Sequence, residues 1–183
     1  MITIDRESRR IWKFDPNYTT VEFTIRNLWY NVKGRFGFVE GTIALDEQDI
    51  SRSSVTATIK AHTIDTKNKK RDAHLLLRDF LDAENFRDIE FKSTSVRRGR
   101  DRDSLDLEGT LTVKDKSVPV SLAVNEMDRS RSPNGEEFVY YSATTELDRF
   151  ALGISYGRGF IGRRLKVTIN VQASNIPKMR KSL

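Results

Sequence analysis

The sequence predicts an all-β protein: a single antiparallel barrel of about eight strands with one short helical segment. Apolar residues alternate with polar ones in stretch after stretch, which is the period of half-buried strands. Short polar turns join most of these stretches, as they do in antiparallel hairpins. One break in this pattern, residues 66–82, has the leucines and strong helix formers of a short helix.

The alternating stretches predict strands over residues 10–15, 20–26, 36–45, 54–61, 89–91, 105–113, 118–124, 138–149 and 165–173. The first strand ends at the turn pair Pro16-Asn17. A single open antiparallel sheet of this length would leave costly edges, so we expect the strands to close into a barrel or to fold into a sandwich. An eight-stranded barrel can hold either packed side chains or one small ligand.

A change of parity in the third expected strand favours the barrel. Phe36 and Phe38 are at even positions, whereas Ile43 and Leu45 are at odd ones. One extra residue near Glu40-Gly41 would bring both pairs to the same face, so we predict a β-bulge there. Bulges of this kind bend strands, as the closure of a barrel requires.

The break in the strand pattern reads TKNKKRDAHLLLRDFLD and predicts a helix near residues 68–78. A short helix beside a barrel is expected to close or flank the cavity, with its leucines facing inward. Its polar residues Arg71, Asp72 and His74 would then lie at the rim. The alternative is a crossover helix that caps an ordinary packed core.

The composition limits the classes of function. The chain has 183 residues, which fits one domain, expected over residues 10–175 with terminal extensions at 1–9 and 176–183. The net charge of +6 favours anionic partners without choosing among them. The absence of cysteine excludes disulfides and thiol catalysis. No secretory signal and no run of about 18 apolar residues is evident, so we expect no transmembrane segment and a cytoplasmic protein, or an exported one if the chain is trimmed.

No motif for catalysis or metal binding stands out. The two histidines, His62 and His74, lack the spacing and further ligands of a zinc site, so no metal and no cofactor is expected. No nucleophile-elbow sequence is present.

The glycine-rich stretch GISYGRGFIG, residues 153–162, lacks the Gly-Lys-Ser/Thr ending of a phosphate loop. We expect a flexible loop at the barrel mouth, with Arg158, Arg163 and Arg164 supplying positive charge. The basic segments of the chain lack aromatic stacking platforms and a reading helix, so nucleic-acid binding is not expected.

Several short motifs together resemble the YceI-like family over roughly residues 10–175. The most specific are Arg71-Asp72-Ala73-His74-Leu75 and the following Asp79-Phe80-Leu81-Asp82. The other matching motifs include Trp12-Lys13-Phe14-Asp15-Pro16, Phe38-Val39-Glu40-Gly41, Ile89-Glu90-Phe91-Lys92-Ser93 and Gly109-Thr110-Leu111-Thr112-Val113. The resemblance implies a lipocalin-like barrel that encloses a long-chain isoprenoid or related amphiphilic lipid. It implies binding, and transport or storage, without catalysis.

The cavity wall is therefore expected to include Phe23, Ile25, Phe36, Phe38, Ile59, Leu75, Phe80, Phe91, Leu111, Val120 and Leu122. Arg71, Asp72 and His74 would order the helical segment or meet the lipid head group. The pattern leaves open whether Tyr140 or Tyr141 faces the cavity. Two alternatives stay open: an enzyme with His74 as acid or base on an apolar substrate, and a packed structural or nucleic-acid-interacting barrel. A homodimer is compatible with the pattern.

Overall fold

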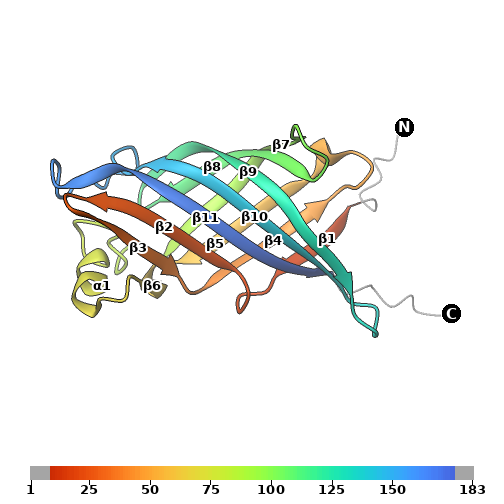
Figure 1. The fold of residues 1–183 in the computed structure, drawn as a ribbon, viewed down its shortest axis with the longest axis horizontal. Coiled ribbons are helices and arrows are strands. Elements are labelled where there is room, and N and C mark those ends of the chain that lie inside the picture. Colours follow the sequence, from red (N-terminus) through yellow and green to blue (C-terminus); the bar gives the residue numbers. More distant parts are fainter. Residues whose placement is uncertain (1–8, 176–183) are drawn as a thin grey trace.

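The computed structural model describes residues 9–175, in which eleven strands form one antiparallel sheet (Figure 1). The strands are β1 Arg10–Phe14, β2 Thr20–Asn27, β3 Tyr30–Phe36, β4 Val39–Leu45, β5 Ser54–Lys60, β6 Ile64–Asp65, β7 Asp88–Arg98, β8 Ser104–Val113, β9 Lys116–Arg131, β10 Glu137–Asp148 and β11 Ile161–Asn175. One α-helix, α1 Lys69–Leu75, and two single turns of 3-10 helix, Ile50–Arg52 and Ala61–Thr63, complete the described residues. Of the extensions expected at 1–9 and 176–183, all residues except residue 9 lie outside this range.

Eight of these strands close the sheet into a barrel. Hydrogen-bonded neighbours follow the order β1, β4, β5, β7, β8, β9, β10 and β11, and β11 pairs again with β1. Strands β2, β3 and β6 continue the sheet from the remaining edge of β11. The closed antiparallel barrel with one short helix confirms the predicted fold class.

Closure depends on the length of β11, which reaches past two consecutive strands. Its last residues pair with β1, whereas the longer preceding part pairs with β2. Pro16 lies between β1 and β2, where a residue without an N–H group interrupts the ladder. The same stretch is held in a turn by Asp15, whose carboxylate accepts a hydrogen bond from the Asn17 amide at 2.9 Å.

The β-bulge predicted near Glu40-Gly41 is wrong. Strand β4 pairs with β1 and β5 without any shift of register at that point. The parity changes because the chain leaves β3 at Phe36, turns through Gly37 and Phe38, and enters β4 at Val39. Register shifts occur instead in three other ladders, at Tyr140/Tyr141, Ser93/Ser95 and Ile161/Leu165.

Helix α1 is shorter than the helical pattern predicts. Asn68 caps its N-terminus by accepting a hydrogen bond from the Arg71 amide at 3.0 Å. After Leu75 the chain turns back on itself, and the amides of Leu81 and Ala83 donate to the carbonyls of Leu75 and Leu76. These bonds satisfy the carbonyls at the helix end and fold residues 76–83 against the barrel.

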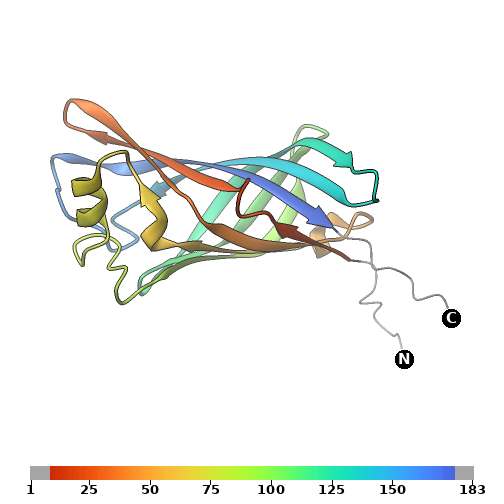
Figure 2. The same ribbon diagram turned by 90° about the horizontal axis from the view of Figure 1, so that it is seen from below.

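The two ends of the barrel differ. Figure 2 places α1, the β2–β3 turn and the β10–β11 loop at one end, with β1 and the last part of β11 at the other. We call these the α1 end and the β1 end. Within residues 9–175 no helix is long and apolar enough to cross a membrane. The same residues contain no group of three or more acidic or histidine side chains arranged to hold a metal ion.

Candidate ligand-binding cavity

An apolar cavity of about 480 Å³ runs along the inside of the barrel. Inward-facing residues of the eight barrel strands, of β2, β3 and β6, of α1 and of neighbouring loops line it, and nearly all of them are aliphatic or aromatic. No aspartate or glutamate of the described chain contributes to this lining. The volume lies within the range of about 300–1,000 Å³ that is typical of small-molecule sites. The interior is therefore open rather than filled by side chains.

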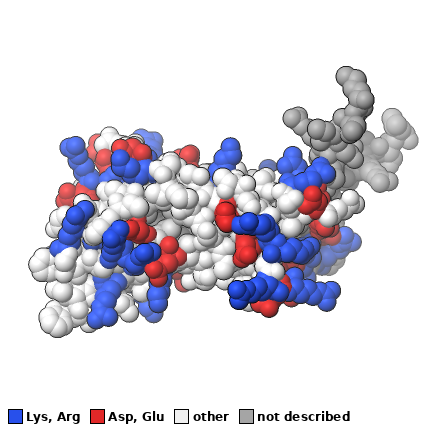
Figure 3. All heavy atoms as spheres, turned by 90° about the horizontal axis from the view of Figure 1, so that it is seen from above, with Lys and Arg blue, Asp and Glu red and all other residues white. Residues whose placement is uncertain are grey.

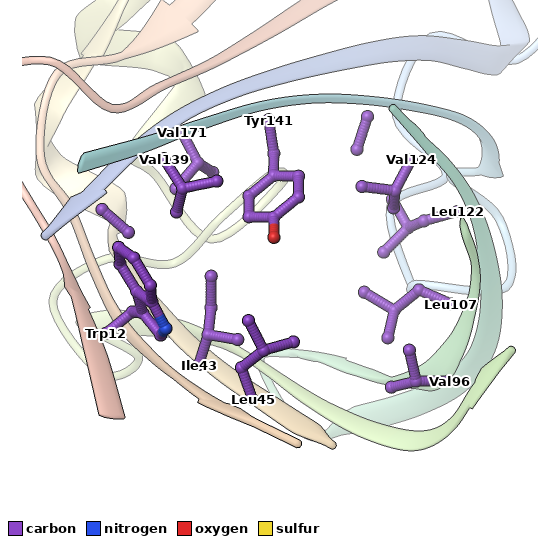
Figure 4. Packing of buried hydrophobic residues seen from close by; sticks show 12 residues of the cluster. Trp12, Ile43, Leu45, Val96, Leu107, Leu122, Val124, Val139, Tyr141 and Val171 are labelled. Carbon is purple, nitrogen blue, oxygen red and sulfur yellow. The ribbon is translucent and has the colours of Figure 1, made fainter. Parts of the chain in front are cut away.

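A cluster of buried side chains surrounds the β1 end of the cavity. Figure 4 shows Ile43, Leu45, Leu107 and Leu122 pointing inward from opposite walls around an open centre. Trp12 is fully buried beside them and helps to close this end of the barrel. The wall here is mostly aliphatic because the alternate side chains that the strands place on the inner face are mainly valine, leucine and isoleucine.

Tyr141, not Tyr140, faces the cavity, which answers the question that the pattern left open. Its hydroxyl donates to a carboxylate oxygen of Glu126 at 3.3 Å, and Glu126 in turn accepts two hydrogen bonds from Arg129. Burial of the phenol raises the pKa of Tyr141 well above its usual value. The hydroxyl is therefore neutral and already engaged.

Glycine leaves space for aromatic rings in the wall. A Cβ atom on Gly109 would lie 2.5 Å from ring atoms of Phe91, and one on Gly34 would overlap Phe23. Both phenyl rings line the cavity. The missing side chains at these two positions thus let Phe91 and Phe23 pack back against the strands instead of filling the interior.

Polar groups gather at the α1 end of the cavity. There the lining includes Arg71, His74, Arg149, Tyr156 and Asn27. Tyr156 is also 46% exposed, so the same side chain contacts both the cavity and the solvent. The α1 end is therefore the side at which a bound molecule would meet polar groups and water.

Arg71 and Asp72 fix the start of α1 through the buried Thr66. The Asp72 carboxylate accepts hydrogen bonds from the Thr66 amide at 2.9 Å and from its hydroxyl at 2.5 Å. Arg71 donates from Nε to the Thr66 hydroxyl at 2.8 Å and from Nη2 to its carbonyl at 2.9 Å. Thr66 thus bonds to both charged side chains, through its hydroxyl and its backbone, and holds Arg71 at the cavity wall.

His74 lies between two aromatic rings. Its imidazole makes edge contacts with Phe80 and Tyr156, each with ring centroids 5.0 Å apart. Its Nε2 is 3.8 Å from a carboxylate oxygen of Asp79. These contacts join α1 to the β10–β11 loop across the end of the barrel.

Arg149 organises the β10–β11 loop. It also lines the cavity, which the sequence analysis did not predict. Its side chain is only 2% exposed and donates to the carbonyls of Gly162, Ile154, Tyr156 and Ile161 at 2.7–2.9 Å. Burial lowers the pKa of Arg149, and the nearby charge of Arg158 lowers it further. The only signal in the sequence was the Arg-Phe pair ahead of the glycine-rich stretch.

The other arginines of this segment are more neutralised than the sequence suggests. Arg163 pairs with Asp148 at 2.6 Å, and Arg164 pairs with Glu146 at 3.5 Å. The hydrogen bond from Arg163 lowers the pKa of Asp148 to about 2. Arg158 alone of the three has no carboxylate within 4.0 Å among the described residues, and its guanidinium lies 4.6 Å from the Phe150 ring.

Most of the residues predicted for the site line the cavity, whereas two do not. The lining contains Phe23, Ile25, Phe36, Ile59, Arg71, His74, Leu75, Phe80, Phe91, Leu111, Val120 and Leu122. Phe38 is 36% exposed on the outer surface, because it lies in the turn between β3 and β4 rather than on an inward position of a strand. Asp72 points to Thr66 and lies outside the lining, so it orders the helical segment.

The fold and the cavity together define a class of protein: a closed antiparallel barrel that holds an apolar ligand-sized cavity with polar groups at one end. Residues 12–173 match the sequence profile of the YceI-like domain, and the chain belongs to this family.

Curated relatives and solved structures agree with that assignment. Proteins named YceI from Salmonella arizonae and Salmonella enteritidis are 30% identical over 159 residues, which cover 86% of this chain and 82% of theirs. The fold is similar to that of BcnA from Burkholderia cenocepacia, with a TM-score of 0.78, 15% identity and coverage of 87% and 98% of the two chains.

Two further structures share the fold. The YceI protein of Campylobacter jejuni has a TM-score of 0.69 at 23% identity and covers 80% of this chain and 86% of its own. A polyisoprenoid-binding domain from Saccharophagus degradans has a TM-score of 0.67 at 12% identity, with coverage of 90% and 98%.

Proposed function

We propose that this protein binds one long-chain isoprenoid or related amphiphilic lipid and carries or stores it without chemical change. The apolar tail would occupy the barrel, and the head group would lie at the α1 end. One observation carries the proposal: a cavity of about 480 Å³ with an apolar wall and its basic residues and histidine collected at one end. The ligand of the Saccharophagus degradans domain, which shares the fold, supports the choice of ligand class.

The energetics allow useful affinity. Burying about twenty methylene groups at roughly 0.8 kcal/mol each gives on the order of 16 kcal/mol. Association costs about 4–15 kcal/mol, so the remainder permits micromolar or tighter binding. A barrel that is open before the ligand enters loses little further free energy to rearrangement of its own core.

Arg71, His74 and Tyr156 are the groups proposed to meet the head group. All three line the cavity, and each is held by contacts with its neighbours: Arg71 by Thr66, His74 and Tyr156 by each other's rings. Because the lining has no carboxylate, a head group that accepts hydrogen bonds or carries negative charge would be favoured over a cationic one.

A carrier role is proposed rather than catalysis because His74 has aromatic neighbours and one distant carboxylate. A general base must itself lie within hydrogen-bond reach of the proton that it removes, and a further hydrogen-bonded group usually orients it. The variant His74→Gln separates the two roles: a carrier keeps most of its affinity, whereas an enzyme loses turnover on its lipid.

The test begins with the protein as expressed in its native host. Organic extraction followed by mass spectrometry should release about one long-chain lipid per protein, and the emptied protein should take up a quinone or prenyl lipid again. The variant Ala143→Trp places an indole in the cavity, and its matched control Ala123→Trp places one on the outer face of the adjacent strand β9. Uptake that survives Ala143→Trp in a folded protein, or a clean extract with no uptake, would contradict the proposal.

A further inference from the structure

Six of the ten exposed large apolar side chains of the described chain lie at the α1 end of the barrel. They are Leu28, Trp29, Tyr30, Leu77, Tyr156 and Phe160. We call this set the mouth patch. Trp29 is 90% exposed and Phe160 is 64% exposed, so neither contributes to the core. A soluble protein gains nothing in stability from such side chains, and exposed groups of this kind mark interaction sites.

The segments that carry the mouth patch are fixed to one another. The Leu28 amide donates to the Phe160 carbonyl at 3.1 Å and ties the β2–β3 turn to the β10–β11 loop. The ring of Tyr156 contacts those of His74 and Phe80, which ties the same loop to α1 and the turn after it. The mouth patch is therefore one surface, whose three segments are held together by these contacts.

The mouth patch is continuous with the cavity. Tyr156 belongs to both, because its ring lines the cavity and is also exposed. Leu77 follows α1, whose residues Arg71, His74 and Leu75 line the same end. A lipid that enters or leaves at the α1 end would thus pass directly beside exposed apolar side chains.

Unpaired cations flank the patch. Arg26 and Lys33 are exposed on the outer face of the β2–β3 hairpin, and Arg158 lies in the loop beside Phe160. Within residues 9–175 none of the three has a carboxylate within 4.0 Å. Figure 3 shows uncharged surface at the left end of the molecule, with blue and some red side chains beside it. The tip is therefore uncharged, and unpaired cations lie next to it on the β2–β3 hairpin and the β10–β11 loop.

We propose that the mouth patch docks the protein on an anionic lipid bilayer, with Trp29 and Phe160 inserted at the interface. Tryptophan and tyrosine favour the level of the lipid head groups, and arginine and lysine next to them are attracted to anionic lipids. The inference rests on the proposed lipid-carrying function in one respect: docking at the mouth would bring the cavity against the bilayer from which its ligand comes. The same six residues could instead join two copies of the chain, and the test distinguishes the two occupants.

The fluorescence of Trp29 provides the measurement. The chain has two tryptophans, and Trp12 is fully buried at the opposite end of the barrel. The full-length protein is mixed with phosphatidylcholine vesicles, either pure or containing about 30% phosphatidylglycerol. With the anionic vesicles we expect co-sedimentation, a blue shift of the emission, and quenching by brominated lipid. The variant Trp29→Phe should lose the spectral changes.

Substitutions divide the effect into its apolar and electrostatic parts. Trp29→Ser and Phe160→Ser should each weaken vesicle binding by about tenfold or more. Arg26→Gln and Arg158→Gln should each weaken binding to anionic vesicles by about fivefold and leave binding to neutral vesicles unchanged. The matched control Tyr18→Ser removes an aromatic as exposed as Phe160 from the β1–β2 connection and should change binding by less than about twofold.

The outcomes separate this inference from the proposed function. Absence of binding to anionic vesicles, with uptake of a solvent-delivered quinone intact, would overturn the docking surface and leave the carrier role standing. Vesicle binding without any lipid uptake would support the docking surface and overturn the carrier role. Equal affinity for pure phosphatidylcholine would overturn the electrostatic part. A dimer in sedimentation velocity that Trp29→Ser dissociates would assign the patch to a second copy of the chain and overturn the membrane assignment.

Discussion

Replacing Arg149 by methionine should destabilise the protein by about 3–5 kcal/mol, the difference between what its hydrogen bonds contribute and what burial of its charge costs. The guanidinium is buried and makes four hydrogen bonds to backbone carbonyls of residues 154–162. Hydrogen bonds to charged groups contribute about 1.5–3 kcal/mol each, so four give about 6–12 kcal/mol gross. The cost of burying the cation, several kcal/mol, offsets part of this. In the methionine variant the carbonyls of the loop lose their donors.

Urea unfolding followed by circular dichroism measures this change, and hydrogen exchange of residues 150–162 shows whether the loop opens first. Arg149→Lys should recover only part of the loss, because a single ammonium group cannot reach four carbonyls that surround a planar guanidinium. The matched control is Arg158→Met, since Arg158 is exposed and contacts only the Phe150 ring among aromatic groups. That change should cost less than about 1 kcal/mol. A loss below about 1 kcal/mol in Arg149→Met would refute the assignment of Arg149 as the organiser of this loop.

Three further predictions follow from the same contacts. Gly109→Ala should destabilise the barrel by about 1–3 kcal/mol in urea unfolding and reduce lipid uptake, because the new Cβ would lie 2.5 Å from Phe91 and push the ring inward. The neutral control is Gly37→Ala, whose Cβ would be 3.7 Å from its nearest neighbour. The hydrogen bond from Arg163 holds the pKa of Asp148 at about 2, below the ordinary 3.8. The stabilising contribution of the Asp148 carboxylate is therefore complete above pH 3.8 and is lost as the pH falls towards 2. Over this interval the urea midpoint should fall less in Asp148→Asn than in the unsubstituted protein, and identical pH profiles would contradict the pairing. Phe38→Lys should leave lipid uptake unchanged because Phe38 lies on the outer surface, and loss of uptake in the folded variant would return Phe38 to the cavity wall.

Alternation along the strands carried most of the information in the sequence. Val120 and Leu122 face inward because strand geometry places alternate side chains on the same face, whatever the partner strand is. The helical segment was also readable, since local propensity depends on neighbouring residues only. These features are local, and local features can be read from the order of the residues.

Features that depend on contacts between distant segments could not be read in this way. The parity change before Ile43 was interpreted as a bulge within one strand, whereas it separates two strands that have different partners. Tyr156 was missed because the glycine-rich stretch has no period, and Arg149 because it is the last residue of an expected strand. Their place at the cavity is set by loop carbonyls and by the ring of His74. Arg163 and Arg164 look like free charges in the sequence, but their carboxylate partners lie on the neighbouring strand.

The sequence by itself determined that this chain forms antiparallel strands with one apolar face and a short helix, because the period of side chains and the propensity of each residue are local properties. Only the tertiary structure decided that the apolar faces enclose an open cavity rather than a filled core. That outcome depends on how far opposite walls stand apart once β11 closes on β1, and on where glycine lets an aromatic ring lie flat against the wall. It also decided that exposed apolar residues gather at one end, because the segments that carry Trp29, Leu77 and Phe160 are distant in the chain and lie at the same end of the folded barrel (Figure 2).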